Sequence, residues 1–379
     1  DAVVRQFHRT LACRTYLTGG MGSRHSDEAF GDDFELPPDR SYSETCAGIA
    51  SVMLAWRLLL HTGETRYADV MERALFNVVA TSPSEQGTAF FYTNTLHQRT
   101  AGTPADPDRV NARAVAQGRA PWFEVSCCPT NVARTLASLA GYVATADDSG
   151  IQLHQWVSAD IATTVAGATV ALAVRTDYPA NGDLVVTVVD CPAQPLEIAL
   201  RIPQWAQGAS IVDGAPVAGH LARVHRSFRP GEEIRFAVAM TPRFTAADPL
   251  IDAVRGCVAV ERGPLVLCAE SIDLPDGLSV ADVAVDPTHP LVESDGRVLA
   301  SFTRVDHPPR SWPYSGQAGA GVDTAADTLA AAFDPSNVAG TRFEAALIPC
   351  HAWANRGPST MRVWMPVADA PSDGGLSES

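Results

Sequence analysis

The chain has 379 residues, of which 46% are hydrophobic and 19% are charged, a composition that supplies packed cores and excludes disorder over most of its length. All 28 basic residues are arginine, and with 43 acidic residues the net charge is −15, which argues against nucleic acid or an anionic membrane surface as a partner. The longest apolar run, 49–60, contains Arg57 and falls short of the ~18 residues that a membrane-spanning helix needs.

Helical periodicity dominates the first 147 residues. Apolar side chains recur at i, i+3, i+4 and i+7 over 1–11, 49–60, 67–79 and the stretch from Pro129 to Val143, which predicts four helices. Pro129 falls in the first turn of the last one, where a missing N–H costs least. Loops rich in Gly, Pro, Asp, Ser or Ala connect these helices over 18–43 and 98–120, and the second loop is predicted to be a surface insertion.

Strand-like alternation replaces helical periodicity after Gly150. It is clearest over 169–175, 184–189, 196–202 and 234–240, a pattern typical of an antiparallel β-sandwich. A second β-rich block begins near Gly256, and a Gly/Ala-rich stretch that we expect to be mobile interrupts it over 316–332. We therefore predict a helical domain over 1–148 and β-sandwich domains over 149–250 and 251–379, leaving open whether the last strands return to the first β-sandwich.

The eight cysteines are not spaced like the disulfide framework of a small secreted domain. Five of them are predicted to be small buried hydrophobes, namely Cys13, Cys191, Cys257, Cys268 and Cys350. The other three border predicted helix N-termini, where the partial positive charge favours the thiolate that binds metals and attacks carbon. Together with Glu44, the thiols of Cys46, Cys127 and Cys128 could complete a tetrahedral zinc site. Spacing alone leaves open the alternative that Cys128 is part of a core.

Glu28 is the leading candidate for a general acid. It lies in a glycine-rich loop beside Phe30, and an apolar setting of this kind favours the protonated carboxyl group. The alternative is a solvated loop glutamate. Asp32, Asp33 and Glu35 crowd the same loop, so the pattern does not choose among these carboxylates.

Several ordered motifs together resemble glycoside hydrolase family 127, whose founding activity is a β-L-arabinofuranosidase, with family 146 as a related neighbour. The resemblance spans nearly the whole chain. Its motifs are YLTGGMGS at 16–23, EAFG at 28–31, ELP at 35–37, ETCA at 44–47, YADVMER at 67–73, FFYTN at 90–94, CCPTN at 127–131, ERGPL at 261–265 and WANRG at 353–357.

The resemblance implies a role for each matched residue. Cys127 corresponds to the nucleophile and Glu28 to the general acid/base. The implied zinc ligands are Glu44, Cys46, Cys127 and Cys128, and the implied sugar-binding residues are Tyr92 and Glu72.

The resemblance also implies a fold and an activity. The fold is the C-terminal half of an (α/α)6 barrel followed by two β-sandwich domains, and the matched motifs begin partway through the barrel, so we expect its earlier helices to be absent. The activity is a retaining hydrolase that releases L-arabinose from β-L-arabinofuranosides. A zinc-bound Cys127 thiolate would attack the sugar while Glu28 protonates the leaving oxygen. The implied partner is an arabinofuranoside or oligosaccharide, with a homodimer as an option.

Two other functions stay open. One is a non-catalytic, zinc-stabilised protein that binds carbohydrate, and the other is a related glycosidase for a different sugar. A free nucleophilic thiol survives best where thiols stay reduced, so we expect a cytoplasmic location.

Overall fold

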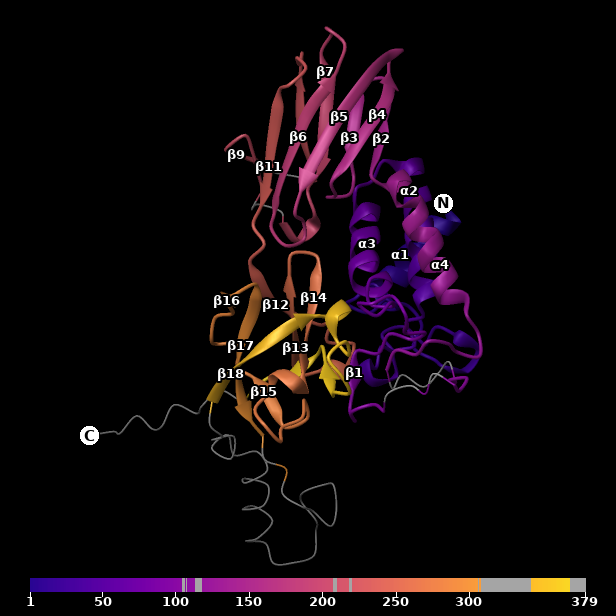
Figure 1. Cartoon of the computed structure of the whole chain (residues 1–379), viewed down its shortest axis with the longest axis vertical. Coiled ribbons are helices and arrows are strands. Elements are labelled where there is room, and N and C mark those ends of the chain that lie inside the picture. The colour runs from indigo at the N-terminus through magenta and orange to yellow at the C-terminus, as the bar shows by residue number, and fades with distance from the viewer. Residues whose placement is uncertain are drawn as a thin grey trace, which may run out of the picture.

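A computed structural model describes residues 1–368 except 104–105, 107, 113–117, 207–209, 218–219, 306 and 308–341. The helices gather on one side of the molecule, and the strands form two blocks beside them (Figure 1). One block contains β2 to β11 and the other contains β12 to β20 with β1. The predicted mobile stretch, 316–332, lies outside the described residues, as does part of the predicted insertion at 98–120.

The four predicted helices are confirmed, with small shifts of their ends. They are α1 (Ala2–Cys13), α2 (Thr45–Thr62), α3 (Arg66–Ala74) and α4 (Cys127–Ser138). The predicted helix over 67–79 is α3 continued by a wider π-helical turn, η3 (Leu75–Val79), and α4 continues into η4 (Leu139–Tyr142). Two short 3-10 turns, η1 (Ser26–Glu28) and η2 (Pro38–Arg40), lie in the first long loop. These elements do not by themselves establish an (α/α)6 barrel.

Helices α2 and α3 form a tight hairpin. Gly63 ends α2 with a positive φ of 73°, and its N–H donates to the carbonyl of Leu59 at 2.8 Å, which is the left-handed cap that glycine favours. Gly48 lets α2 approach η3, because a Cβ there would lie 2.7 Å from Val78 Cγ1. By length and composition α2 could cross a membrane, yet Val52 and three other residues of it are buried in the core of this helical unit.

The middle unit is the predicted β-sandwich. One sheet has the order β10-β7-β3-β2 and the other has the order β4-β5-β6-β11-β8-β9. All its neighbouring strands are antiparallel except β3 and β7, which pair in parallel. Buried side chains of both sheets form one core. The strands are β2 (Ala144–Ala146), β3 (Gly150–Leu153), β4 (Ala159–Val165), β5 (Ala168–Thr176), β6 (Asp183–Asp190), β7 (Leu196–Arg201), β8 (Ser210–Val212), β9 (Ala215–Val217), β10 (Leu221–Arg226) and β11 (Glu233–Val238).

Over its described residues, the C-terminal unit forms one ten-stranded hydrogen-bonded sheet rather than the two separate sheets expected of a second sandwich. Its strand pairings run from β13 through β14, β18 and β17 to β15. Val285 of β15 forms a bridge with Val367, just beyond β20. Since β20 pairs with β13, this bridge closes the sheet on itself. The strands are β1 (His97–Gln98), β12 (Pro242–Ala246), β13 (Cys257–Arg262), β14 (Leu265–Glu270), β15 (Val283–Val285), β16 (Val292–Ser294), β17 (Arg297–Arg304), β18 (Arg342–Pro349), β19 (Met361–Arg362) and β20 (Met365–Pro366).

The strand pairings decide one question that the sequence left open and move one strand to another domain. The last strands do not return to the first β domain, because β19 pairs with β14 and β1 while β20 pairs with β13. Strand β12, which the sequence placed in the first β domain, pairs with β13 and belongs to the C-terminal sheet. The reason is that alternation identifies strands but not their partners, which are set by packing between distant segments.

Strand β14 has two buried faces. Leu265, Leu267 and Ala269 point into the core that the closed sheet encloses, whereas Val266 and Cys268 pack in a second core with residues of the helical unit. The C-terminal unit is thereby attached directly to the loops of the helical unit. Of the five cysteines predicted to be buried, Cys268 and Cys350 are buried, and Cys13, Cys191 and Cys257 are half-buried.

Candidate metal–thiol site

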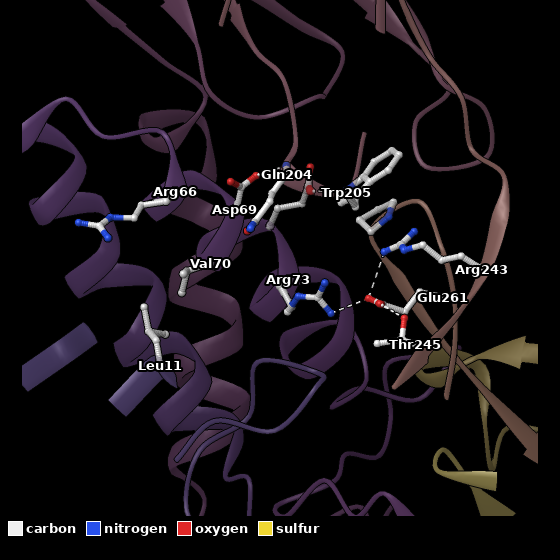
Figure 2. A pocket seen from close by; sticks show the side chains of 12 residues that line it. Leu11, Arg66, Asp69, Val70, Arg73, Gln204, Trp205, Arg243, Thr245 and Glu261 are labelled. Carbon is white, nitrogen blue, oxygen red and sulfur yellow. Dashed lines mark hydrogen bonds and ion pairs between the residues drawn. The ribbon is translucent and has the colours of Figure 1, made fainter. Parts of the chain in front are cut away.

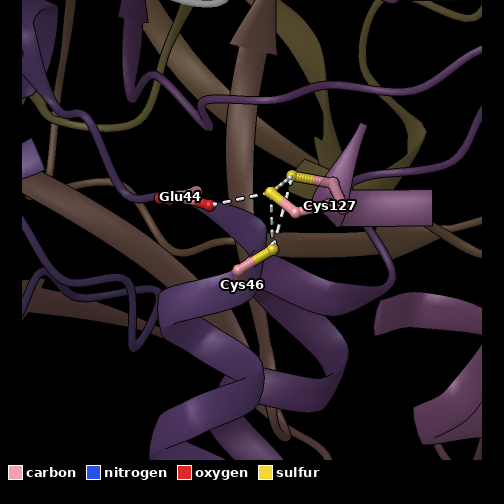
Figure 3. A group of neighbouring side chains, drawn as sticks. Glu44, Cys46 and Cys127 are labelled. Atoms are coloured by element: carbon pink, nitrogen blue, oxygen red, sulfur yellow. Dashed lines mark hydrogen bonds between the residues drawn. The ribbon is translucent and has the colours of Figure 1, made fainter. Parts of the chain in front are cut away.

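Three thiols and one carboxylate meet where α2 and α4 begin. The sulfur of Cys46 lies 3.2 Å from that of Cys127 and 3.7 Å from that of Cys128, and the last two sulfurs are 3.9 Å apart. Cys127 Sγ also lies 3.3 Å from Glu44 Oε1. Figure 3 shows the side chains turned toward a common centre. The structure therefore brings together all four residues that the sequence proposes as metal ligands.

The two helix N-termini position these side chains. Glu44 is the N-cap residue of α2, Cys46 lies in its first turn, and α4 begins at Cys127. A bridge between Glu44 and Thr93 fixes the backbone before α2. Both helix dipoles direct their positive ends at the thiols, which favours the ionised sulfurs that a metal needs.

The donor atoms fit a four-coordinate metal ion. Their ligand atoms all lie within 4.8 Å of one another. Metal–sulfur bonds of about 2.3 Å at tetrahedral angles place two sulfurs about 3.8 Å apart, and two of the three sulfur pairs are within 0.1 Å of that separation. The group could thus hold a metal ion without rearrangement of the backbone.

The three thiols differ in pKa. Donation from the Cys128 thiol lowers the pKa of Cys46, helped by Asn131 Nδ2 at 2.8 Å from its sulfur. Burial raises the pKa of Cys127 to about 12, and the same bond to Cys46 together with burial raises the pKa of Cys128. In the absence of a cation the first thiolate is therefore Cys46, and a bound cation is what would ionise the others.

An aromatic wall encloses one side of the thiols. Tyr92 Oη lies 3.3 Å from Cys127 Sγ, and its ring meets the rings of Tyr42 and Phe123 edge-on with centroids 6.4 Å and 5.9 Å away. Burial raises the pKa of Tyr92, so its hydroxyl stays protonated and can donate to the sulfur. Tyr92 accordingly lies beside the thiol that the sequence proposes as nucleophile.

Glu28 is connected to this wall by one hydrogen bond. The hydroxyl of Tyr42 donates to Glu28 Oε1 at 2.9 Å, and Tyr42 in turn contacts Tyr92. Glu28 is exposed and Phe30 is 43% exposed, so the apolar setting expected for this carboxylate is not found. Its link to the site is Tyr42 and not burial against Phe30.

The structure does not bring Glu72 to the thiols. Its carboxylate accepts from Arg201 Nη2 at 2.5 Å, from Tyr178 Oη at 2.9 Å and from Trp205 Nε1 at 3.2 Å. These partners belong to the middle unit. The structure places Glu72 in a buried junction between domains, where it also lines a cavity, and its sugar-binding role stays a prediction.

A cavity of about 530 Å³ adjoins this junction (Figure 2). Residues of all three units line it, including Asp69 of α3, Trp205 of η5 (Gln204–Ala206) and Glu261 of β13. Glu261 is paired with Arg73 at 2.7 Å and with Arg243 at 3.3 Å. None of the four thiol-site residues lines this cavity, so it is separate from the thiol site.

Sequence reasoning assigned no role to Asn131 or Arg201. Asn131 was visible in the CCPTN motif, and its spacing of four residues from Cys127 places both on one helix face. Arg201 ends an apolar strand, β7, and is fully buried. A charged residue at the end of a buried strand is the signal that could have identified it.

Known proteins match the chain over nearly its whole length. Family models for the catalytic, middle and C-terminal domains of glycoside hydrolase family 127 match residues 2–141, 150–240 and 242–366. A non-reducing end β-L-arabinofuranosidase of Bifidobacterium longum is 34% identical over 96% of the chain and 55% of that protein.

Solved structures agree with this assignment. A family-127 β-L-arabinofuranosidase from Geobacillus stearothermophilus superposes with a TM-score of 0.77 at 31% identity, over 94% of this chain and 55% of that one. A second family-127 β-arabinofuranosidase gives a TM-score of 0.74 at 29% identity, over 94% of this chain and 54% of that one. The chain spans about half the length of these relatives. It belongs to glycoside hydrolase family 127.

Proposed function

We propose that the protein is a retaining glycosidase that releases L-arabinose from the non-reducing end of β-L-arabinofuranosides. The observation that carries this proposal is the position of Cys127 Sγ, which lies within 4 Å of Cys46, Cys128, Glu44 and Tyr92. A bound cation at this position would ionise the Cys127 thiol, and its neighbours would hold the sulfur in one direction. The named activity of the relatives supplies the substrate class.

Zinc is the metal that we propose for the site. Three sulfur donors and one carboxylate oxygen at tetrahedral separations are a typical zinc ligand set. Glu44, Cys46, Cys127 and Cys128 would hold the ion. When bound, it keeps the Cys127 sulfur deprotonated at neutral pH and stabilises it when it leaves the sugar.

The reaction that we propose has two steps. In the first, the Cys127 thiolate attacks the anomeric carbon and forms a C–S bond while the glycosidic C–O bond breaks, and Glu28 gives its proton to the departing oxygen. In the second, Glu28 takes a proton from water, whose oxygen attacks the same carbon and displaces the sulfur as a thiolate. Two inversions give net retention. Tyr92 donates to the sulfur and orients it.

The site requires both carboxylates to act in different roles. Glu44 contacts Cys127 and would be a ligand, whereas Glu28 contacts Tyr42 and would exchange protons with the substrate. Tyr42 donates to Glu28 Oε1 and helps to hold that carboxylate in place. We also propose that α1 to α4 form half of an (α/α)6 barrel and that the enzyme works in a reducing compartment.

The decisive experiment compares Cys127→Ser with wild type in the intact gene product. Hydrolysis of an aryl β-L-arabinofuranoside should fall at least about 1,000-fold, because a serine hydroxyl in this setting is neither ionised nor a good leaving group. Mass spectrometry of wild type mixed with a slow substrate should find a pentosyl group on the peptide that contains Cys127.

The matched control is Cys191→Ser, which changes a half-buried thiol of the middle unit and should leave turnover unchanged. Ordinary turnover in Cys127→Ser, or product formed with inversion by proton NMR, would refute the thiolate mechanism. A wild type that binds zinc but has no activity on any arabinofuranoside would favour the non-catalytic zinc protein.

A further inference from the structure

Arg119 is a half-buried arginine whose donors are shared between two domains. Its guanidinium group donates to carbonyl oxygens of Thr81 at 2.8 Å and Ser82 at 3.3 Å in the helical unit. It also donates to the carbonyl of Trp353 at 2.7 Å and that of His351 at 3.2 Å in the C-terminal unit, and to the side-chain oxygen of Asn355 at 3.2 Å.

All five acceptors are uncharged oxygens. Burial therefore lowers the pKa of Arg119, to about 10, and the group is held by geometry rather than by a carboxylate. Only the planar fork of arginine offers enough N–H donors to satisfy five oxygens on two separate segments. The arrangement links residues 81–82, residues 351–355 and the loop that leads to Cys127.

The same contacts fix the ring of Phe91. Arg119 Cζ lies 4.4 Å from the centroid of that ring, and Trp353 stacks on it with centroids 4.9 Å apart and planes 14° apart. The N–H of Phe91 donates to Ser82 O at 2.8 Å, and Phe90 and Ala120 exchange two backbone hydrogen bonds of 3.0 Å each. The segments around residues 82, 91 and 120 therefore move as one body with Arg119.

This body ends at the thiol site in two places. Tyr92 directly follows Phe91, and its hydroxyl lies 3.3 Å from Cys127 Sγ. The carbonyls of Phe91 and Tyr92 also accept from the side chain and the N–H of Thr45, which precedes Cys46 at the start of α2. A shift of residues 90–93 would thus move Tyr92 and the first turn of α2 relative to Cys127.

We propose that Arg119 is a positioning residue that couples the WANRG loop of the C-terminal domain to the thiol site. Its guanidinium group donates to protein oxygens, and it acts by fixing Phe91 and thereby the direction of the Tyr92 hydroxyl. The C-terminal domain then serves catalysis and not stability alone. The expected loss of kcat rests on the proposed function, whereas the expected loosening of the segment around Phe91 does not.

The test uses Arg119→Lys, which keeps the positive charge but cannot reach five acceptors. We expect kcat for an aryl β-L-arabinofuranoside to fall about 10- to 100-fold, as for misplacement of a reacting group by about 1 Å, with KM changed less than threefold and metal content unchanged. Guanidinium ion should restore part of kcat in Arg119→Ala. Arg57→Met is the control, because Arg57 is exposed on α2 and donates only within its own helix.

Hydrogen–deuterium exchange gives a readout that does not depend on activity. The amides of Phe90 and Phe91 should exchange at least tenfold faster in Arg119→Lys and at the wild-type rate in Arg57→Met. Unchanged exchange there, or a kcat within twofold of wild type, would overturn the inference. If Arg119→Lys does not fold, Asn355→Ala tests the same link by removing one acceptor. If the wild-type protein hydrolyses no arabinofuranoside, the proposed function is refuted. The hydrogen–deuterium exchange rates of Phe90 and Phe91 would still decide whether Arg119 fixes this segment.

Discussion

Replacing Arg201 with methionine should destabilise the protein strongly. Arg201 is fully buried and donates at 2.5 Å to both Asp69 and Glu72, and at 2.6 Å to the carbonyl of His154. Methionine leaves two carboxylates at a buried junction without their cation, a change that costs about 3–5 kcal/mol. For a domain of about 150–250 residues, this loss of unfolding free energy corresponds to a decrease of roughly 10 °C in Tm.

The sign of the pH dependence follows from the carboxylates. Burial already raises the pKa of Asp69 even with Arg201 present, so removal of the cation should raise it further. A carboxyl group whose folded pKa lies above its unfolded pKa costs stability when it is ionised and ceases to do so as it protonates. The stability deficit of Arg201→Met relative to wild type should therefore shrink as pH falls from 7 toward 5.

The assay is thermal and urea unfolding of Arg201→Met, of the double variant with Glu72→Gln, and of the control Arg235→Met. Arg235 pairs with Glu233 on the surface, with its side chain 69% exposed, so its loss should cost under about 0.5 kcal/mol. The double variant should regain part of the loss. If Arg201→Met costs no more than Arg235→Met, the reading of Glu72 as a junction residue is wrong.

Three further predictions concern the thiol site and acid stability. Asn131→Ala removes the amide that donates to Cys46 Sγ at 2.8 Å. Metal affinity, measured by competition with a chromophoric chelator, should then fall about 10- to 100-fold. An unchanged affinity would show that this hydrogen bond does not support metal binding. Glu28→Gln should lower kcat about 100- to 10,000-fold, less for substrates with good leaving groups, and equal losses for poor and good leaving groups would contradict its role as the acid. Burial lowers the pKa of His97 and that of His154 to about 4. Because the unfolded chain binds these protons more readily, stability should be lost as pH falls from about 6.5 toward 4, and replacing both histidines with glutamine should flatten that part of a Tm-against-pH curve.

The sequence was sufficient to predict the helices and the middle strands, because their patterns are local. The run from Ile49 to Leu60 repeats its apolar face every three or four residues, and α2 follows it. The partners of each strand were not predictable from local patterns. The parallel pairing of β3 with β7 and the pairing of β20 with β13 join segments that are far apart in sequence.

The thiol site was predictable in composition but not in geometry. Cys46 and Cys127 are separated by 81 residues, and only their shared position at helix N-termini suggested a common site. The resemblance supplied the grouping, and the structure shows the four donor atoms together. The same resemblance suggested that Glu72 binds the sugar, which stays a prediction, and it gave no sign of the contact with Arg201, a partner that lies 129 residues further along the chain.

The environment of Glu28 shows a limit of reasoning from neighbours in sequence. Phe30 suggested an apolar surrounding, yet adjacent residues in a loop need not pack on one another. Glu28 has a positive φ of 54°, which turns the chain so that its carboxylate meets the hydroxyl of Tyr42. A contact across 14 residues of irregular loop has no periodic signal to reveal it.

The central claim is that Glu44, Cys46, Cys127 and Cys128 hold one zinc ion. Elemental analysis of protein purified under reducing conditions tests it directly, with Cys46→Ser and the control Cys191→Ser measured alongside. We expect one zinc per chain in wild type and in the control, and far less than one in Cys46→Ser. Absence of zinc from wild type, or an undiminished zinc content in Cys46→Ser, would contradict it.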